Sequence, residues 1–239
     1  MTKKAATGAV TGTARAPRRK DSLSRERIIR AATEILDSGG EKALTLRALT
    51  VRLGTGYGAI YHHVADKGDL LATAADDVIT GVLSGAVADA DADPRAALRR
   101  LALDLFDAVD AHPWVGAELS RQPWRPALLD FYESIGRLLD ALGVPEEARS
   151  DAAGTLVNHV LGVAAQNAAN ARLLADGRDT DRESFLADAA TRWARVDPER
   201  YPFVHAAAAR LGRHDDREQF AFGVDVFLAG IASLSRTQR

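Results

Sequence analysis

The sequence contains no cysteine among its 239 residues. Disulfide bonds, thiol catalysis and cysteine-ligated zinc are therefore excluded, and the composition suits a reducing compartment such as the cytoplasm. Long apolar runs are also lacking, because no uninterrupted stretch approaches the roughly 18 to 20 residues that cross a bilayer. The N-terminus is basic, but no apolar segment follows it, so we expect no secretory signal. These absences predict a cytoplasmic chain with no membrane partner.

Strict alternation of apolar and polar residues, the pattern of a half-buried strand, is missing as well. Apolar residues instead recur at helical spacing along most of the chain. Prolines 113, 123 and 126 are expected to segment the chain between helices. The sequence therefore predicts an all-α fold, with helices at about 24–38, 45–53, 57–64, 66–82, 95–111, 128–142, 145–174, 184–196, 203–211 and 217–235.

Charge is divided unevenly along the chain. Residues 1–70 carry 13 Lys and Arg against 7 Asp and Glu, whereas residues 71–239 carry 18 against 26. A basic N-terminal unit on an acidic body is typical of a module that meets polyanions. Within the basic unit, residues 1–22 are rich in Thr, Ala, Gly and basic side chains and lack an apolar period, which indicates a disordered arm.

Residues 44–71 carry the most specific pattern in the chain. A short helix is capped by Thr45 and ends at Gly54, and a second short helix begins at Tyr57 after a tight turn. An amphipathic helix precedes both. This arrangement predicts a helix-turn-helix, in which the second short helix reads DNA. The outer face of that helix is unusually aromatic, and large aromatic surfaces left in water usually have a partner.

The segment 24–71 resembles the DNA-binding domain of the tetracycline-repressor (TetR) family. The shared pattern is a first helix ending in Gly, a Thr-x-Arg helix start, Leu-Gly, a short recognition helix with Tyr-x-His, and a Lys before the next helix. The resemblance implies that Thr45 and Arg47 touch phosphates and that Lys67 clamps the DNA backbone. It also implies a set of residues that face the major groove or its walls: Tyr57, Gly58, Ala59, Tyr61, His62 and His63.

These roles are physically sensible, because helix N-termini and basic side chains attract phosphate and small residues let a helix approach base edges. Alternatives stay open for single residues. Tyr61 is also compatible with half-burial, and the two histidines with solvated surface positions. Gly58 and Ala59 carry no side-chain donors, so shape or methyl contacts can carry more of the readout. A nucleotide-binding loop at Gly54, Gly56 and Gly58 is excluded, because no buried strand precedes these glycines and they do not have the Gly-x-Gly-x-x-Gly spacing.

The rest of the chain resembles the C-terminal domain of the tetracycline-repressor subgroup more weakly. The cues are His112-Pro113-Trp114, the Leu142-Gly143 pair that opens a long helix, and the stretch from Phe220 to Gly230. The resemblance implies a small-molecule pocket inside the body and a pairing of two subunits through the last helices.

Polar residues within the long helix support the pocket independently. Amides that interrupt an apolar helix need hydrogen-bond partners when buried, which suggests a polar ligand or ordered water. Aromatic side chains can supply apolar walls. The alternative is that these groups cap helix ends or face solvent. The predicted pocket residues are His112, Trp114, Trp124, Phe131, Asn158, His159, Gln166, Asn167 and Asn170.

The last helix carries two apolar stripes. One stripe runs from Phe220 to Ile231 and suits the core of the subunit. The other contains small residues that permit close helix approach, and it predicts a homodimer interface. The alternative is a helix buried twice within one chain. The predicted interface residues are Phe222, Val226, Ala229, Gly230 and Ser233.

We therefore expect a DNA-binding domain at 23–68 and a ligand-binding and dimerisation domain at 69–239. The predicted function is a transcriptional regulator, a repressor by resemblance, that leaves double-stranded operator DNA when a small-molecule effector binds. One rival is an effector-blind DNA-binding dimer. The other is an all-α enzyme, which is disfavoured because Gly-x-Ser-x-Gly, His-Glu-x-x-His and phosphate-loop motifs are absent. We expect no catalytic residue, metal or cofactor.

Overall fold

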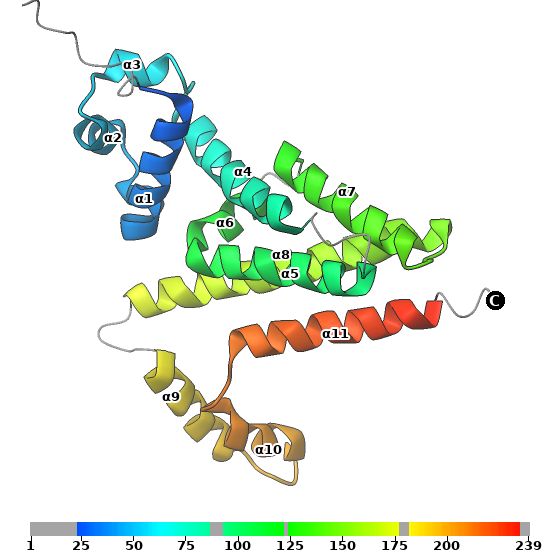
Figure 1. Ribbon diagram of the computed structural model, residues 1–239. Coiled ribbons are helices and arrows are strands. Elements are labelled where there is room, and N and C mark those ends of the chain that lie inside the picture. Colours follow the sequence, from blue (N-terminus) through cyan, green and yellow to red (C-terminus); the bar gives the residue numbers. More distant parts are fainter. Residues whose placement is uncertain (1–22, 87–92, 122–123, 177–181, 235–239) are drawn as a thin grey trace, which may run out of the picture.

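The computed structural model describes residues 23–86, 93–121, 124–176 and 182–234. Over these residues the chain forms eleven helices and no strand, which confirms the all-α prediction (Figure 1). The expected arm at 1–22 lies outside the described residues. The helices are α1 (Arg25–Ala43), α2 (Leu46–Leu53), α3 (Tyr57–Tyr61), α4 (Lys67–Ala86), α5 (Pro94–Ala111), α6 (Pro113–Arg121), α7 (Pro126–Ala141), α8 (Glu146–Asp176), α9 (Arg182–Ala194), α10 (Pro202–Leu211) and α11 (Asp216–Leu234).

The first three helices form a small unit at one end of the molecule (Figure 1). Ser24 caps α1 by accepting a hydrogen bond from the backbone N–H of Arg27. The predicted stop at the Gly39-Gly40 pair is a kink instead, because Gly40 has φ 65° and ψ −172° while α1 resumes and reaches Ala43. Gly54 ends α2 in the left-handed conformation, at φ 62°. Glycine adopts positive φ without the steric cost of a Cβ, which fits it to this tight turn.

The N-terminal unit has its own apolar centre. Ile28 of α1, Leu49 of α2 and Ile60 of α3 are each at most 1% exposed. These three contributions hold the short helices against the longer one, because helices as short as α2 and α3 gain most of their stability from tertiary packing. The orientation of α3 is therefore set by the burial of Ile60.

Helix α4 leaves this unit and enters the larger body (Figure 1). It contacts α1 near its start and α5, α6 and α7 further along. In the body, α5 packs against α4, α7, α8 and α11, and α8 also packs against α6 and α7. The body core includes Leu98, Leu101 and Phe131, each at most 1% exposed.

Helix α6 was not expected from the sequence, where Pro113 suggested only a break. Pro113 is instead the first residue of the helix. Proline is tolerated there, because the first backbone N–H groups of a helix have no partner within the helix and the fixed φ of proline suits it. The proline therefore begins α6 rather than separating two other helices.

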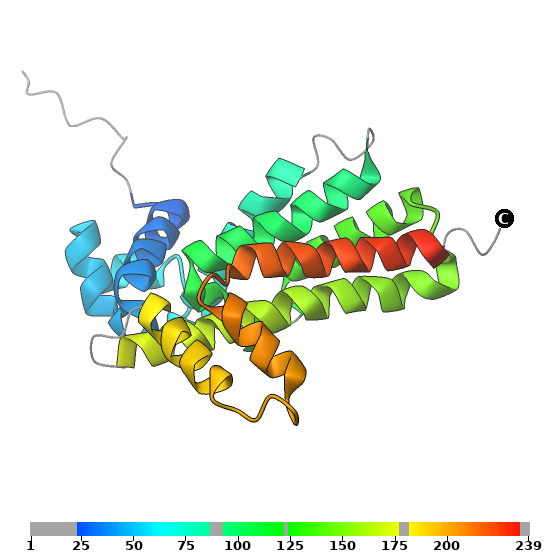
Figure 2. The ribbon, with the colours of Figure 1, turned by 90° about the horizontal axis from the view of Figure 1, so that it is seen from below.

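Helices α9 and α10 form a hairpin that projects from the body on the side of α8 and α11 (Figure 2). The two helices pack chiefly against each other. Only Leu186 and Ala208 of these two helices are buried. The hairpin is thus attached to the body through few contacts of its own.

Candidate nucleic-acid interface and effector domain

The outward face of α3 is open along one helical turn. Tyr57 and Tyr61 stand one turn apart, and each is 52% exposed, while Ile60 between them is fully buried. Gly58 and Ala59 are exposed, and a Cβ built on Gly58 meets no atom within 4 Å. The face thus combines two aromatic side chains with a bare stretch of backbone, which allows close approach to a groove wall or base edge.

The histidines that follow lie at the end of the same helix. His62 is the C-terminal cap of α3 and is exposed, whereas His63 is partly buried. Their rings pack edge to face, with centroids 5.6 Å apart. The structure therefore brings all six residues predicted to face the groove to α3 and its C-terminal end.

The predicted phosphate contacts lie at the start of α2. The Thr45 hydroxyl oxygen accepts a hydrogen bond from the Ala48 backbone N–H at 3.1 Å, which fixes the beginning of the helix. Thr45 and Arg47 are both exposed and line a surface hollow of ≈ 520 Å³ between α1 and α2. Neighbouring Arg52 is engaged in an ion pair with Glu34 of α1. The helix start and the Arg47 side chain together form a positively polarised edge.

Lys67 has a structural contact that the sequence did not reveal. Its Nζ donates a hydrogen bond to the backbone carbonyl oxygen of Glu41, at 2.7 Å. This contact ties the start of α4 to the end of α1. An ammonium group carries three donors, so this contact leaves two donors of Lys67 for a phosphate.

Two residues predicted for the pocket lie instead at the junction between the two units. The Nδ1 atom of His112 lies 2.7 Å from Oδ1 of Asp37, and Nε1 of Trp114 donates to the same oxygen at 2.8 Å. Asp37 belongs to α1, so these contacts cross from the body to the helix-turn-helix unit. The role of Asp37 could not be predicted from the sequence, because it occupies an ordinary polar position on an amphipathic helix.

The other predicted pocket residues differ widely in exposure. Phe131 is fully buried in the body core, whereas Trp124 is 77% exposed. On α8 the amides differ in exposure, with Asn158 and Gln166 exposed and two further along partly buried: Asn167 and Asn170.

His159 sits where α8 meets α11. Its ring stacks on Phe220 with centroids 5.0 Å apart and an interplanar angle of 1°. Phe220 in turn stacks on Phe106 of α5 at 4.7 Å. Among the described residues the buried Nε2 of His159 has no hydrogen-bond partner. A Cβ on Gly223 would come within 2.5 Å of that atom, so the glycine is what lets the ring fit.

The two stripes of α11 differ in exposure as their patterns suggested. Phe220, Val224, Leu228 and Ile231 are buried against the body. On the other stripe Phe222 is 70% and Val226 55% exposed, and three small residues are exposed beside them: Ala229, Gly230 and Ser233. An apolar strip of this kind is therefore left uncovered in the single chain.

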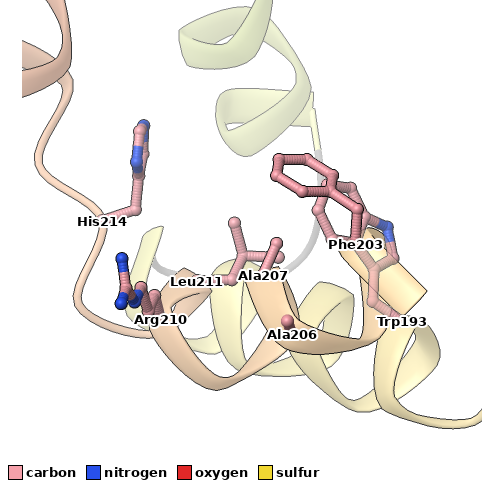
Figure 3. A pocket seen from close by; sticks show the side chains of 7 residues that line it. All are labelled: Trp193, Phe203, Ala206, Ala207, Arg210, Leu211 and His214. Carbon is pink, nitrogen blue, oxygen red and sulfur yellow. The ribbon is translucent and has the colours of Figure 1, made fainter. Parts of the chain in front are cut away.

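The α9–α10 hairpin forms a second hollow, of ≈ 440 Å³. Figure 3 shows Trp193 and Phe203 at one end, Arg210 and His214 at the other, and small apolar side chains between them. No pattern in the sequence marked this hollow, because its residues come from two helices and a turn.

None of the helices in the described part of the chain is long and apolar enough to cross a membrane. Within the same residues, no three His, Asp or Glu side chains gather in a way that would hold a metal ion.

Comparison with known proteins decides the family. The profile "Bacterial regulatory proteins, tetR family" matches residues 28–74, and "Tetracyclin repressor-like, C-terminal domain" matches residues 88–234. The chain belongs to the TetR family. The resemblance read from the sequence is therefore confirmed, and the chain is a DNA-binding transcriptional regulator built from a helix-turn-helix domain and a helical C-terminal domain.

Individual TetR proteins match over most of the chain. A TetR transcriptional regulator from Streptomyces coelicolor is 44% identical, with a TM-score of 0.78, covering 90% of this chain and 100% of that one. The transcriptional repressor DrrR1 from Streptomyces coeruleorubidus is 29% identical over 95% of this chain and 84% of its own length. ActR from Streptomyces coelicolor shares the fold, with 21% identity and a TM-score of 0.72 over 91% of this chain and 98% of its own. ActR has also been solved in complex with (S)-DNPA and with actinorhodin.

Proposed function

We propose that this TetR-family chain is a cytoplasmic, homodimeric repressor that leaves its operator when a small-molecule effector binds the helical body. The proposal includes no catalytic step. The observation that carries it is the outward face of α3, where Tyr57 and Tyr61 are half exposed on either side of buried Ile60. A buried anchor with an exposed aromatic outer face is what a recognition helix requires, because the helix must be held rigidly while its surface stays free for DNA.

The remaining DNA contacts are proposed around that helix. Thr45 and Arg47 at the start of α2 would meet one phosphate group, and Lys67 at the start of α4 another. Such contacts position the protein on the duplex, while the α3 residues would supply the sequence-dependent part. The basic balance of residues 1–70 supports this division, because phosphate neutralisation dominates protein–DNA affinity.

Dimerisation is proposed through the uncovered stripe of α11. Phe222 and Val226 are large apolar residues that remain mostly in water in a single chain. Pairing this stripe with that of a second copy would bury both sides under two-fold symmetry. A dimer also gains affinity by gripping two half-sites about one helical turn apart.

The effector is proposed to act on the body, and the complexes of ActR with (S)-DNPA and actinorhodin show that a protein of this fold binds small molecules. Helix α4 is suited to carry the effect, because it contacts α1 at its start and three body helices further along. A ligand that shifts the end of α4 inside the body would move the helix-turn-helix unit, which is the DNA reader, at the other end of α4. Coupling between sites of this kind typically amounts to about 1 to 3 kcal/mol.

Operator-complex titration tests this function. The purified chain is bound to an operator found by selection, and actinorhodin and (S)-DNPA are added as first probes, followed by a wider set of small molecules. Binding of each compound to the free protein is measured separately by calorimetry. The proposal expects at least one compound that binds the body to weaken operator affinity by tenfold or so. If every compound that binds left operator affinity unchanged, the effector-blind dimer would be the correct reading.

A further inference from the structure

The junction between the helix-turn-helix unit and the body is made by a small set of polar side chains. Asp37 of α1 lies opposite the start of α6, where it meets His112 and Trp114. Toward the other end of α6, Arg121 pairs with Glu41 of α1 at 2.9 Å. Both ends of α6 therefore contact α1: Trp114 and Arg121 are seven residues apart on α6, and their partners Asp37 and Glu41 are four residues apart on α1.

The chemistry at Asp37 is specific to one oxygen. The indole N–H of Trp114 can only donate, and an ionised carboxylate can only accept. His112 must therefore donate from Nδ1, so both hydrogen bonds converge on Oδ1 of Asp37 at 2.7 and 2.8 Å. Trp114 is 8% exposed, so its donor has little access to water as a substitute partner.

Helix α6 is seated just as closely on the body. A Cβ built on Gly116 would stand 3.2 Å from the Ala164 carbonyl oxygen of α8. Val115, Leu119 and the Glu118 side chain are buried on the same helix. A displacement of α6 relative to α8 thus has little room to be absorbed within the body and would be passed to α1.

We propose that Asp37, His112 and Trp114 form an interdomain latch that sets the angle of the DNA reader relative to the body. The helix-turn-helix unit is thus held against the body both by α4 and by this latch. Asp37 is a positioning residue here, since it acts through its hydrogen bonds with His112 and Trp114. The consequence for operator binding rests on the proposed function, whereas the positioning itself does not.

Because both bonds use Oδ1, the chain offers a matched pair of variants. Asp37→Asn keeps a carbonyl oxygen at that position and should preserve the latch, whereas Asp37→Leu removes the acceptor. Trp114→Phe removes one donor while keeping an aromatic ring in the same place. Trp193→Phe is the control for the loss of an indole, because Trp193 lies on α9 and lines the α9–α10 hollow rather than the junction.

Reader position is measured without DNA or effector. Since the sequence has no native cysteine, nitroxide labels are attached at Val51→Cys on α2 and Leu129→Cys on α7, both exposed. The distance between the two labels is measured by double electron–electron resonance. Labelled chain is mixed with a large excess of unlabelled chain, so that only distances within one protomer contribute to the signal. Circular dichroism verifies that each variant is folded.

The latch predicts a narrow distance distribution for the unmodified chain, Asp37→Asn and Trp193→Phe, and a broader or shifted one for Asp37→Leu and Trp114→Phe. Operator affinity should fall about tenfold in the two latter variants and remain near the original in Asp37→Asn. An unchanged distribution in folded Asp37→Leu overturns the latch. Failure of the unmodified chain to select any DNA sequence would instead overturn the proposed function and leave the distance result to decide the latch.

Discussion

Gly116 of α6 lies against Ala164 of α8 so closely that a Cβ on the glycine would stand 3.2 Å from the alanine carbonyl oxygen. The same Cβ would stand 3.1 Å from Cγ1 of Val109. The absence of a side chain is thus what allows α6 to sit between the body and α1. This close approach makes α6 a second element, beside α4, through which the two domains are held in a fixed relation.

Alanine at Gly116 should therefore be less favourable than alanine at an unobstructed helical glycine. Gly136 of α7 is the matched control, because a Cβ there meets nothing within 4 Å. We expect Gly136→Ala to raise the free energy of unfolding by about 0.5 to 1 kcal/mol through helix propensity. Gly116→Ala should show no such gain, or a loss of about 1 kcal/mol, because α8 must yield. Urea denaturation measures both, and equal gains would contradict the packing described for α6.

The exposed tyrosines of α3 should matter for DNA and not for folding. We expect Tyr57→Ala and Tyr61→Ala each to weaken operator binding about tenfold, in line with the 1–3 kcal/mol typical of good base-edge contacts. Their melting temperatures should stay close to that of the unmodified chain. Ile60→Ala is the contrasting variant, because removing this buried side chain should cost about 2 to 4 kcal/mol of stability. Anisotropy titrations and thermal melts separate the two classes, and unimpaired DNA binding in both tyrosine variants would remove α3 as the reader.

The uncovered stripe of α11 makes its own prediction. Val226→Asp places a carboxylate in the proposed interface, where an unpaired charge is costly to bury. We expect the variant to sediment as a monomer at concentrations where the unmodified chain is a dimer. Leu129→Asp, on the exposed side of α7, is the control and should remain dimeric. A dimeric Val226→Asp chain would assign the interface to other helices.

Low pH should break the ion pair between Arg99 of α5 and Asp225 of α11. The Arg99 guanidinium bonds both carboxylate oxygens of Asp225, at 2.7 and 3.2 Å, and lowers the pKa of that carboxyl below its ordinary value of 3.8. A carboxyl group whose pKa is lower in the folded state than in the unfolded state stabilises the fold at pH values above its unfolded-state pKa. This stabilisation is lost as pH falls through the folded-state pKa. Asp225→Asn should thus be less stable than the unmodified chain at neutral pH, by a small amount because both side chains are over 40% exposed. The difference should vanish below the lowered pKa, and a difference that persists there would show that the ion pair is not its source.

The helix-turn-helix could be predicted from sequence because each of its features is local. Thr45 as a cap, Gly54 as a stop and the apolar spacing around Ile60 all lie within one short segment. Helix α6 was missed because the sequence does not distinguish a proline that begins a helix from one that separates two.

The junction and the body contacts lay beyond such reasoning for a different cause. Asp37 meets Trp114 across 77 positions of sequence, and no periodicity links the two. Likewise, Trp124 and Phe131 are both apolar aromatics near α7, yet one is exposed and the other is in the core. Only the packing of α7 against α4, α5 and α8 determines which of these side chains faces the interior.

Operator recognition is tested by a selection of genomic DNA fragments with the purified, effector-free chain, followed by sequencing. We expect enrichment of an inverted repeat whose half-sites lie about one helical turn apart, bound by two subunits and released as salt increases. Enrichment of no sequence, even at low salt, would contradict the assignment of this chain as an operator-binding repressor.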